Sequence, residues 1–173
     1  LENFSVPGFE ISNEWGNYLS TDVPKGYEST SEVTPLLTTT WNQGCYYNNL
    51  CPADDRGPCD HVWAGCVATA MAQIMKYWNY PASNNTIPGY DDALNYDDEG
   101  NPIEGSDYGS IPEIPVTSYS WSQMPVSLSS SSSSQEVNAV AQLMYHCGVA
   151  VNMNYGPSGS GAGNPRDAYV DYF

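Results

Sequence analysis

One segment constrains the fold of this chain more than any other: an apolar run, TAMAQIMKYW, from Thr69 to Trp78. Gly65 precedes the run and Pro81 follows it, and both residue types mark helix boundaries. Because the run is apolar on most sides, it predicts a buried helix of about three turns that begins near Cys66. A helix of this kind must lie inside a core formed by other parts of the chain.

The composition agrees with a folded domain and excludes two classes of partner. The 173 residues include 14 Tyr, 5 Trp and 3 Phe, and so many aromatic rings need a core to bury them. Four Lys and Arg stand against 20 Asp and Glu, which gives a formal net charge of −16. So few cations form no basic patch for a phosphate backbone or an anionic lipid surface, so we expect neither nucleic-acid nor membrane binding.

Two further helices are predicted in the second half of the chain. Ser133 and Glu136 have the spacing of a capping box, and the apolar stripe that follows them indicates a helix. Gly148 is expected to end that helix in a left-handed conformation before a short strand from Val149 to Met153. A third helix is expected from Pro165 to Phe173, because proline favours the first helical position.

The remaining segments are predicted to be arms and loops. Residues 1–32 mix Gly, Pro, Ser and acidic residues without a period, which indicates an N-terminal arm or the remnant of a propeptide. Residues 82–118 are predicted to be a long connection with at most short strands. The acidic residues between 97 and 107 lack the spacing of a known calcium loop, so a solvated loop is favoured. Gly156 to Gly163 lack a following P-loop Lys, and no cofactor is expected.

The chain has five cysteines, at positions 45, 51, 59, 66 and 147, and an odd number leaves at least one without a partner inside the chain. Cys66 stands where the central helix begins, and unpaired N–H groups at that position favour a thiolate. It is therefore a candidate nucleophile. The alternatives are an inert buried thiol or a disulfide with Cys59.

The other four cysteines can form two disulfides, in three connectivities, or contribute to a metal site. Cys45, Cys51, Cys59 and His61 are close enough in sequence to bind zinc. Their spacings of six and eight residues are loose for a zinc knuckle, so disulfides are favoured. We expect two of the first three cysteines to bridge each other, and we expect no metal.

Four motifs, in this order, resemble the streptopain family of papain-like cysteine peptidases. They are PLLTTTWNQG (Pro35 to Gly44), GCVATAMAQIMKYWNYP (Gly65 to Pro81), YSWSQMP (Tyr119 to Pro125) and QLMYHCGVAVNMNYGPSGSGAG (Gln142 to Gly163). The resemblance covers about residues 33–173. It implies an α+β fold, with this chain forming mainly the helical half of a papain-like catalytic domain.

The resemblance also implies roles for individual residues. The cysteine of the family's GCVATA motif is the nucleophile, which corresponds to Cys66, and the glutamine of the upstream NQG motif lines the oxyanion hole, which corresponds to Gln43. The loop around Ser158, Gly159 and Ser160 resembles the wall that binds substrate, where exposed backbone can pair with an extended peptide. These implications predict a cysteine endopeptidase that acts on polypeptides.

The base that such an enzyme needs is expected outside this chain. The family carries it in a G-G-H-A motif, followed by a W-G-W-G segment, and neither occurs here. The two histidines present, His61 and His146, match no catalytic position of the family. We therefore expect the sheet half of the domain, with the base, on a second chain that begins shortly after Phe173, or on a C-terminal segment missing from this sequence. The composition and the family both favour a secreted bacterial protein.

Two other functions are compatible with the sequence. The chain could be a catalytically silent papain-like module used for binding or adhesion, in which Cys66 no longer reacts. It could also be a zinc-stabilised interaction domain, which depends on the cluster of Cys45, Cys51, Cys59 and His61. A partner chain that carries the missing motifs would favour the peptidase over both.

Overall fold

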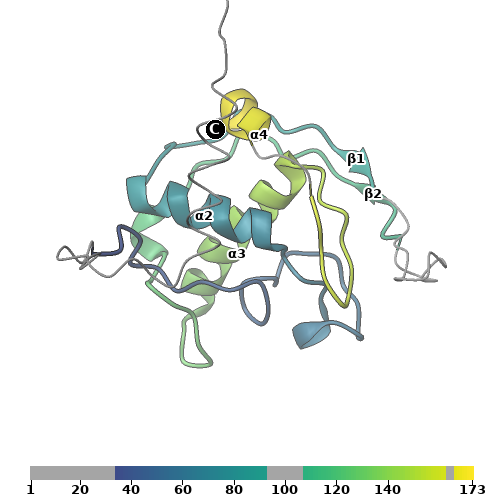
Figure 1. Cartoon of the computed structure of the whole chain (residues 1–173), viewed down its shortest axis with the longest axis horizontal. Helices are drawn as coiled ribbons and strands as arrows, with labels where there is room; N and C mark the ends of the chain where they lie inside the picture. The colour runs from purple at the N-terminus through teal and green to yellow at the C-terminus, as the bar shows by residue number, and fades with distance from the viewer. Residues whose placement is uncertain (1–33, 93–106, 163–165) are drawn as a thin grey trace, which may run out of the picture. The chain divides into compact units, whose positions relative to one another are not determined.

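The computed structural model describes residues 34–92, 107–162 and 166–173. The chain divides into two units, Leu1–Pro35 and Leu36–Phe173, and the elements below belong to the second. In chain order they are η1 (Pro58–Asp60), α2 (Cys66–Trp78), β1 (Tyr90–Asp91), β2 (Ser110–Ile111), η2 (Trp121–Gln123), α3 (Ser134–Ala150) and α4 (Arg166–Tyr172) (Figure 1).

Helix α2 confirms the predicted central helix and its start. It has 13 residues and ends where Asn79, in a left-handed conformation, donates from its N–H to the carbonyls of Lys76 and Met75. One face is buried, including Met71 and Met75, as predicted. The opposite face is exposed in the described part of the chain, contrary to the prediction of a helix buried on most sides; its large exposed side chains are Ile74, Tyr77 and Trp78.

Helix α3 begins as predicted and ends later than predicted. The Ser133 hydroxyl accepts a hydrogen bond from the Glu136 N–H, and the Glu136 carboxylate accepts one from the Ser133 N–H, which completes the capping box. The helix then continues through Gly148 to Ala150, so the predicted stop at Gly148 and the strand from Val149 to Met153 are wrong. The left-handed residue near this end is Asn152, with φ of 48°.

The core lies mainly between α2 and α3. Met71, Ala72 and Met75 of α2 belong to one buried apolar cluster with Val140, Leu143, Met144 and Cys147 of α3. The thiol of Cys147 contacts the sulfur of Met75 at 3.7 Å. Because each buried side chain removes apolar surface from water, this packing holds α2, and with it Cys66, in a fixed place.

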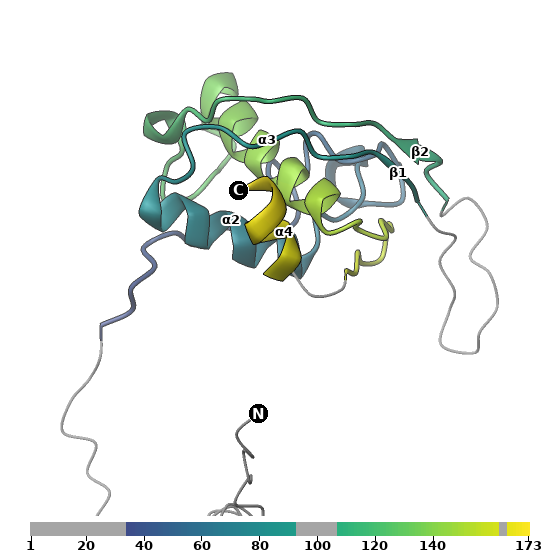
Figure 2. The same cartoon turned by 90° about the horizontal axis from the view of Figure 1, so that it is seen from above.

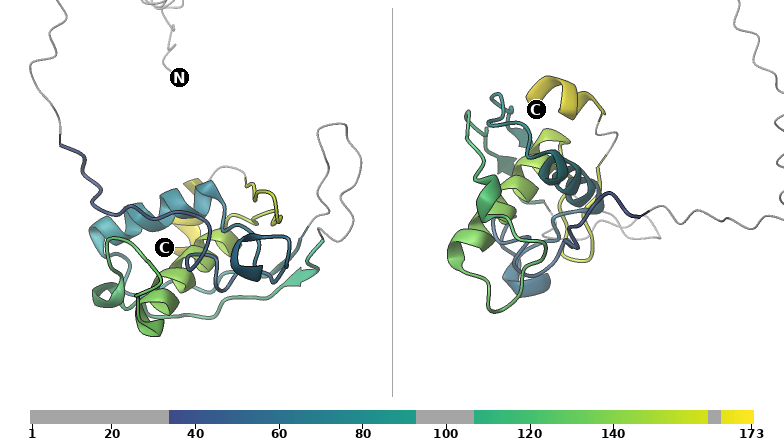
Figure 3. Two further views of the ribbon diagram at one scale, coloured as in Figure 1. Left: turned by 90° about the horizontal axis from the view of Figure 1, so that it is seen from below. Right: turned by 90° about the vertical axis from the view of Figure 1, so that its left-hand side faces the viewer.

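The segments before β1 and after β2 run side by side as a long antiparallel ribbon (Figure 2). Tyr90 pairs with Ile111 in the two-stranded sheet, and Ile87 and Ile114 exchange both backbone hydrogen bonds at 2.9 Å. The ribbon runs along the side of α3 that faces away from α2 (Figures 2 and 3). Short strands in a long connection were predicted for residues 82–118. The acidic positions from 97 to 104 lie outside the described residues.

Helix α4 confirms the third predicted helix, although its predicted start at Pro165 lies outside the described residues. Ala168 of α4 is buried in the core cluster. The carbonyls of Asp171 and Tyr172 accept hydrogen bonds from Asn85, at 3.1 and 2.8 Å, which tie the helix to the ribbon. The combination of packed helices and a small antiparallel sheet is the expected α+β arrangement.

Candidate active site

Cys66 is the first residue of α2, and the residue before it makes that position possible. Gly65 has φ of 90°, a conformation that side chains with a Cβ rarely adopt. A Cβ on Gly65 would also lie 2.6 Å from the terminal methyl of Met153. The carbonyl of Gly65 accepts hydrogen bonds from the Thr69 N–H and hydroxyl, at 3.0 and 2.9 Å. This sharp turn leaves the Cys66 side chain exposed at the start of a helix.

Gln43 is brought to the same turn by a backbone hydrogen bond. Its carbonyl accepts from the N–H of Ala64 at 2.9 Å, which fixes Gln43 beside the residues that lead into Cys66. The preceding segment is anchored on α2 itself, because the N–H of Trp41 donates to the Gln73 side chain at 3.2 Å. The structure therefore brings together two positions that lie far apart in the sequence.

The Gly/Ser loop is tied to the other side of the turn. The hydroxyl of Ser160 donates to the carbonyl of Trp63 at 2.6 Å and accepts from the N–H of Gly156 at 3.0 Å. The indole N–H of Trp63 donates to the carbonyl of Pro157 at 2.9 Å. The carbonyl oxygen of Ser160 would lie 3.4 Å from a Cβ on Gly65, so this loop passes directly beside the residue before Cys66.

The tip of this loop is open to solvent. Ser158 and Gly159 are exposed, and Asn154 and Gly161 close the loop by exchanging backbone hydrogen bonds at 2.8 and 3.0 Å. A Cβ on Gly159 or Gly161 would meet nothing within 4 Å, so backbone at these positions is approachable. The structure thus places Ser160 beside the residues that lead into Cys66, in a structural role, whereas Ser158 and Gly159 lie at the exposed tip of the loop.

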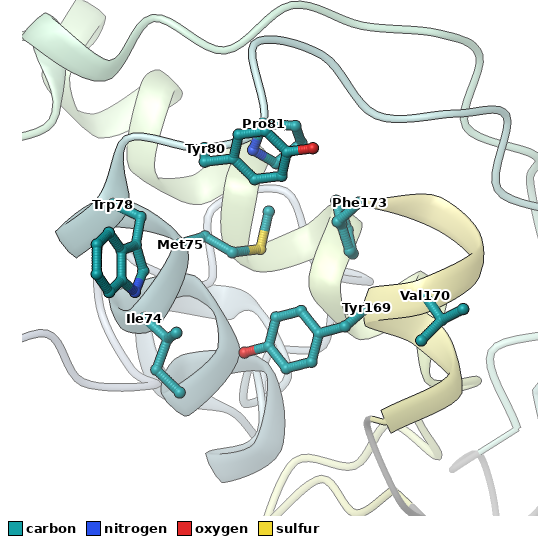
Figure 4. Close-up of a pocket in the computed structure, with 8 residues that line it drawn as sticks. All are labelled: Ile74, Met75, Trp78, Tyr80, Pro81, Tyr169, Val170 and Phe173. Carbon is teal, nitrogen blue, oxygen red and sulfur yellow. The ribbon is translucent and has the colours of Figure 1, made fainter.

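A shallow apolar pocket of about 260 Å³ begins at Cys66 and follows α2. It is lined by Cys66, Val67, Ala70, Met71, Ile74 and Tyr169. A larger pocket of about 640 Å³ lies farther along the same face, between α2 and α4. Figure 4 shows its lining, which consists of Ile74, Met75, Trp78, Tyr80, Pro81, Tyr169, Val170 and Phe173. The exposed face of α2 therefore continues from Cys66 into an extended apolar surface.

The cysteines form one disulfide in the structure. Cys45 is bonded to Cys59, with the two Cα atoms 5.3 Å apart, which confirms that two of the first three cysteines bridge each other. Cys51 and Cys147 are free and buried, so the alternative with two disulfides is wrong. The alternative in which Cys66 pairs with Cys59 is also wrong. The zinc site is excluded for the same reason, because a disulfide removes two of its four ligands.

Both histidines of the chain lie within the described residues, and neither is hydrogen-bonded to the Cys66 thiol there. The His61 ring donates from Nδ1 to the backbone carbonyl of Cys59 at 2.9 Å. His146 is buried in α3, with Nδ1 3.0 Å from the Tyr119 hydroxyl. Burial lowers the pKa of His146 to about 4. It is therefore a neutral core residue at pH 7.

The described residues contain no cluster of three or more His, Cys, Asp and Glu side chains that could hold a metal ion. Among those same residues, no helix is both long enough and apolar enough to cross a membrane.

Sequence reasoning missed one buried residue that supports the site. The side chain of Asn48 is fully buried and donates to the carbonyls of Pro58 and Val62, at 2.8 and 3.1 Å. It thereby holds the loop between Gln43 and Cys66 closed. Its partners are backbone carbonyls distant in the sequence, so no local motif could have identified it.

Comparison with known proteins agrees with this arrangement. The profile of the peptidase C10 family matches residues 41–173. Streptopain from Streptococcus pyogenes is 35% identical over 133 residues, which cover 73% of this chain and 32% of streptopain. The thiol protease/hemagglutinin PrtT from Porphyromonas gingivalis is 34% identical over 140 residues, covering 76% of this chain and 15% of that protein.

Solved structures of one related protease have the same fold. Active wild-type interpain A, a cysteine protease from Prevotella intermedia, matches with a TM-score of 0.64 and 37% identity, over 82% of this chain and 55% of that one. A prointerpain A fragment from the same organism matches with a TM-score of 0.62 and 35% identity, over 94% of this chain and 50% of the fragment. The chain thus spans about a third of streptopain and about half of the solved interpain chains.

Proposed function

Because this chain belongs to the peptidase C10 family, we propose that it supplies the nucleophile half of a cysteine endopeptidase. The observation that carries the proposal is the exposed Cys66 at the first position of α2, with the backbone of Gln43 pinned to Ala64 beside it. The proposed nucleophile, the backbone of the residue proposed to carry the donor and an exposed apolar surface then lie at one turn of the chain. This geometry suits attack on a peptide carbonyl.

In the proposed mechanism, the Cys66 thiolate attacks the carbonyl carbon of the peptide bond. The negative charge moves to the carbonyl oxygen, which accepts hydrogen bonds from the unpaired N–H of Cys66 and from the side-chain amide of Gln43. An imidazolium then protonates the leaving amine, and the C–N bond breaks to give a thioester on Cys66. Water hydrolyses the thioester and returns the thiolate.

We place the imidazole outside this chain. His146 is committed to the core and to Tyr119, and His61 contacts the backbone of its own loop. The relatives extend well beyond the matched region, which supports a further half of the catalytic domain that carries the base. That half, as a second chain after processing or as a continuation of this one, would cover the apolar surface between α2 and α4.

The Gly/Ser loop is proposed to bind substrate backbone. The tip residues Ser158 and Gly159 are exposed, and their loop is fixed against Trp63 and Gly65 by the contacts of Ser160. An extended peptide could pair with this backbone while its scissile carbonyl lies above Cys66. Polypeptides are therefore the proposed substrates.

Two features support a secreted enzyme made as a precursor. The Cys45–Cys59 disulfide is typical of oxidising compartments outside the cytosol. The chain matches the prointerpain A fragment over more of its length, 94%, than it matches active interpain A, 82%. This difference is in the direction expected if residues before 33 belong to a propeptide.

The test uses the full-length enzyme and a generic unfolded protein substrate. Cys66→Ala should abolish cleavage while the circular dichroism spectrum and the melting temperature stay close to those of the wild type. Gln43→Ala should lower kcat by about 100-fold, the usual cost of one lost oxyanion donor. Cys147→Ala is the matched control, because this buried thiol lies outside the site, and it should retain activity. Cleavage by the Cys66→Ala enzyme would refute the proposal.

A further inference from the structure

Gln43 belongs to a loop that a covalent bond closes near its start. Cys45 follows Gln43 by two positions, and it is bonded to Cys59 across a separation of 14 residues. The chain then continues from Cys59 to Ala64, whose N–H holds the Gln43 carbonyl at 2.9 Å. The disulfide and this hydrogen bond therefore fix the segment Gln43–Cys45 from both sides.

The residues at the disulfide adopt backbone conformations that they do not favour by themselves. Tyr46, Cys59 and Asp60 have φ of 73°, 54° and 61°. Non-glycine residues are destabilised in this left-handed region, because their Cβ comes too close to the carbonyl oxygen. Contacts with the surrounding residues must hold these conformations in place. The disulfide is a covalent bond, whereas the other contacts of the loop are hydrogen bonds and packing. When it opens, Cys59 and Tyr46 can relax, and Gly44 and Gln43 can shift with them.

The disulfide is accessible to a reductant, whereas the nearest free thiol in the loop is not reactive. Cys59 is exposed and Cys45 half-buried. Cys51 is buried, and burial raises the pKa of its thiol to about 12, so it stays protonated and exchanges poorly with the disulfide. An external dithiol can donate two electrons and two protons, which breaks the Cys45–Cys59 bond to two thiols while the dithiol closes to its own cyclic disulfide.

We propose that the Cys45–Cys59 disulfide is a positioning element for Gln43, so that the site needs two opposite thiol states at once. Cys66 must be reduced to act as the nucleophile, and Cys45–Cys59 must be oxidised to hold the oxyanion donor in place. The inference rests on the proposed function and adds to it a redox window outside which the enzyme is slow. Strong reduction lowers kcat, whereas strong oxidation blocks Cys66.

The first experiment is a reductant titration of the full-length enzyme. Cleavage of a peptide substrate is measured at rising dithiothreitol, and mass mapping of alkylated peptides follows the state of Cys45 and Cys59. Activity should rise as Cys66 is freed and then fall by about tenfold in kcat, with little change in KM, as the disulfide is reduced. Cys51→Ala is the matched control from the same loop, and its activity should rise and then fall with dithiothreitol as in the wild type. A plateau that persists after complete reduction would overturn the proposal.

The second experiment separates positioning from general stability by a double-mutant cycle. Cys45→Ser/Cys59→Ser should lower kcat by about tenfold in the wild-type background. The activity of this variant should not fall at high dithiothreitol concentrations. In a Gln43→Ala background the same pair of substitutions should change kcat by less than about twofold, since the donor to be positioned is already gone. An equal loss in both backgrounds would mean that the disulfide acts on the whole fold, and the proposal would fail.

The outcomes also distinguish this inference from the proposed function. If Gln43→Ala leaves kcat unchanged, the role of Gln43 is wrong and the positioning role fails with it. If Gln43→Ala slows the enzyme but the disulfide has no coupled effect, only the positioning role fails. Should the double cysteine variant not fold, the wild-type titration decides the matter, with circular dichroism recorded at each dithiothreitol concentration to show that the fall in activity precedes unfolding.

Discussion

At the scale of single residues, the three free cysteines differ in surroundings and therefore in reactivity. Cys66 is exposed, whereas Cys51 and Cys147 are buried. Burial raises the pKa of Cys51 to about 12 and that of Cys147 well above its usual value, so both remain protonated thiols at neutral pH. Alkylating agents react with accessible thiolates, so the burial of Cys51 and Cys147 protects them, whereas Cys66 is open to attack.

We therefore predict that brief treatment of the native enzyme with iodoacetamide labels Cys66 alone. Peptide mapping by mass spectrometry should place the label there, and peptidase activity should fall in proportion to labelling. Denaturation before treatment is the control and should add label at Cys51 and Cys147. Comparable labelling of Cys147 in the native protein would contradict the burial described above.

Gly148 illustrates a glycine required by packing and not by backbone conformation. It lies inside α3, and a Cβ there would lie 2.4 Å from the hydroxyl oxygen of Tyr155, which is fully buried. Alanine favours helices over glycine by up to about 1 kcal/mol, which opposes the clash. Overpacking of a buried site typically costs about 1–3 kcal/mol and exceeds that gain.

We expect Gly148→Ala to lower the free energy of unfolding by about 1–2 kcal/mol, because the clash outweighs the helix propensity. Urea unfolding of the full-length enzyme measures it. In a Tyr155→Phe background the hydroxyl is absent, and the same substitution should cost much less. If the cost is equal in both backgrounds, the hydroxyl is not the cause.

At the scale of elements, the sequence predicted those features that depend on neighbouring residues. The start of α3 follows from the Ser133 and Glu136 side chains, and the start of α2 follows from Gly65 and the apolar run behind it. The end of α3 was mispredicted because Gly148 resembles a helix stop locally, whereas its real constraint is the Tyr155 ring from beyond the helix. Contacts distant in sequence leave no local pattern.

The same distinction applies to the candidate site. Its place at a helix start made Cys66 a candidate nucleophile, since the chemistry of that position is local, and this role stays a prediction. Gln43 was found by family resemblance alone, because the bond that brings it to Ala64 joins two separate segments. The contact of Ser160 with Trp63 was not predictable for the same reason.

His146 makes the packing of α3 sensitive to pH. It is 5% exposed, and burial lowers its pKa to about 4 in the folded state, against about 6.5 for an unfolded chain. The folded state thus binds the proton less tightly than the unfolded state does. The stabilisation from neutral His146 is complete above pH 6.5, declines as the pH falls towards 4, and does not change further below that value.

We predict that His146→Gln removes a pH-dependent part of the stability, on the order of 3 kcal/mol between pH 7 and pH 4. The measurement is urea unfolding of wild type and variant across this range, because the difference between them isolates His146 from the many carboxylates. Tyr119→Phe is the companion variant. It removes the 3.0 Å contact but not the burial, so it should retain most of the pH dependence. A wild-type curve parallel to that of His146→Gln would contradict the prediction.

At the scale of the whole molecule, the most informative feature is the exposed apolar surface between α2 and α4. Trp78 is 71% exposed and Val170 is 74% exposed, and both line the pocket of about 640 Å³ in Figure 4. Contiguous exposed apolar patches are uncommon on soluble monomers and mark interfaces. We have assigned this one to the other half of the catalytic domain.

This assignment predicts that a charge placed in the pocket weakens the union of the two halves, whereas the same charge elsewhere on the surface does not. Trp78→Lys should lower the melting temperature of the full-length enzyme by several degrees and reduce kcat/KM, because an unpaired ammonium would be buried against apolar side chains. Val116→Lys is the matched control, since Val116 is 65% exposed and lies outside the pocket lining. Hydrogen exchange gives the direct readout: α2 amides near Trp78 should be protected in the wild type and should exchange faster in Trp78→Lys alone. If both lysine variants behave alike, the surface between α2 and α4 is not the interface between the two halves of the catalytic domain.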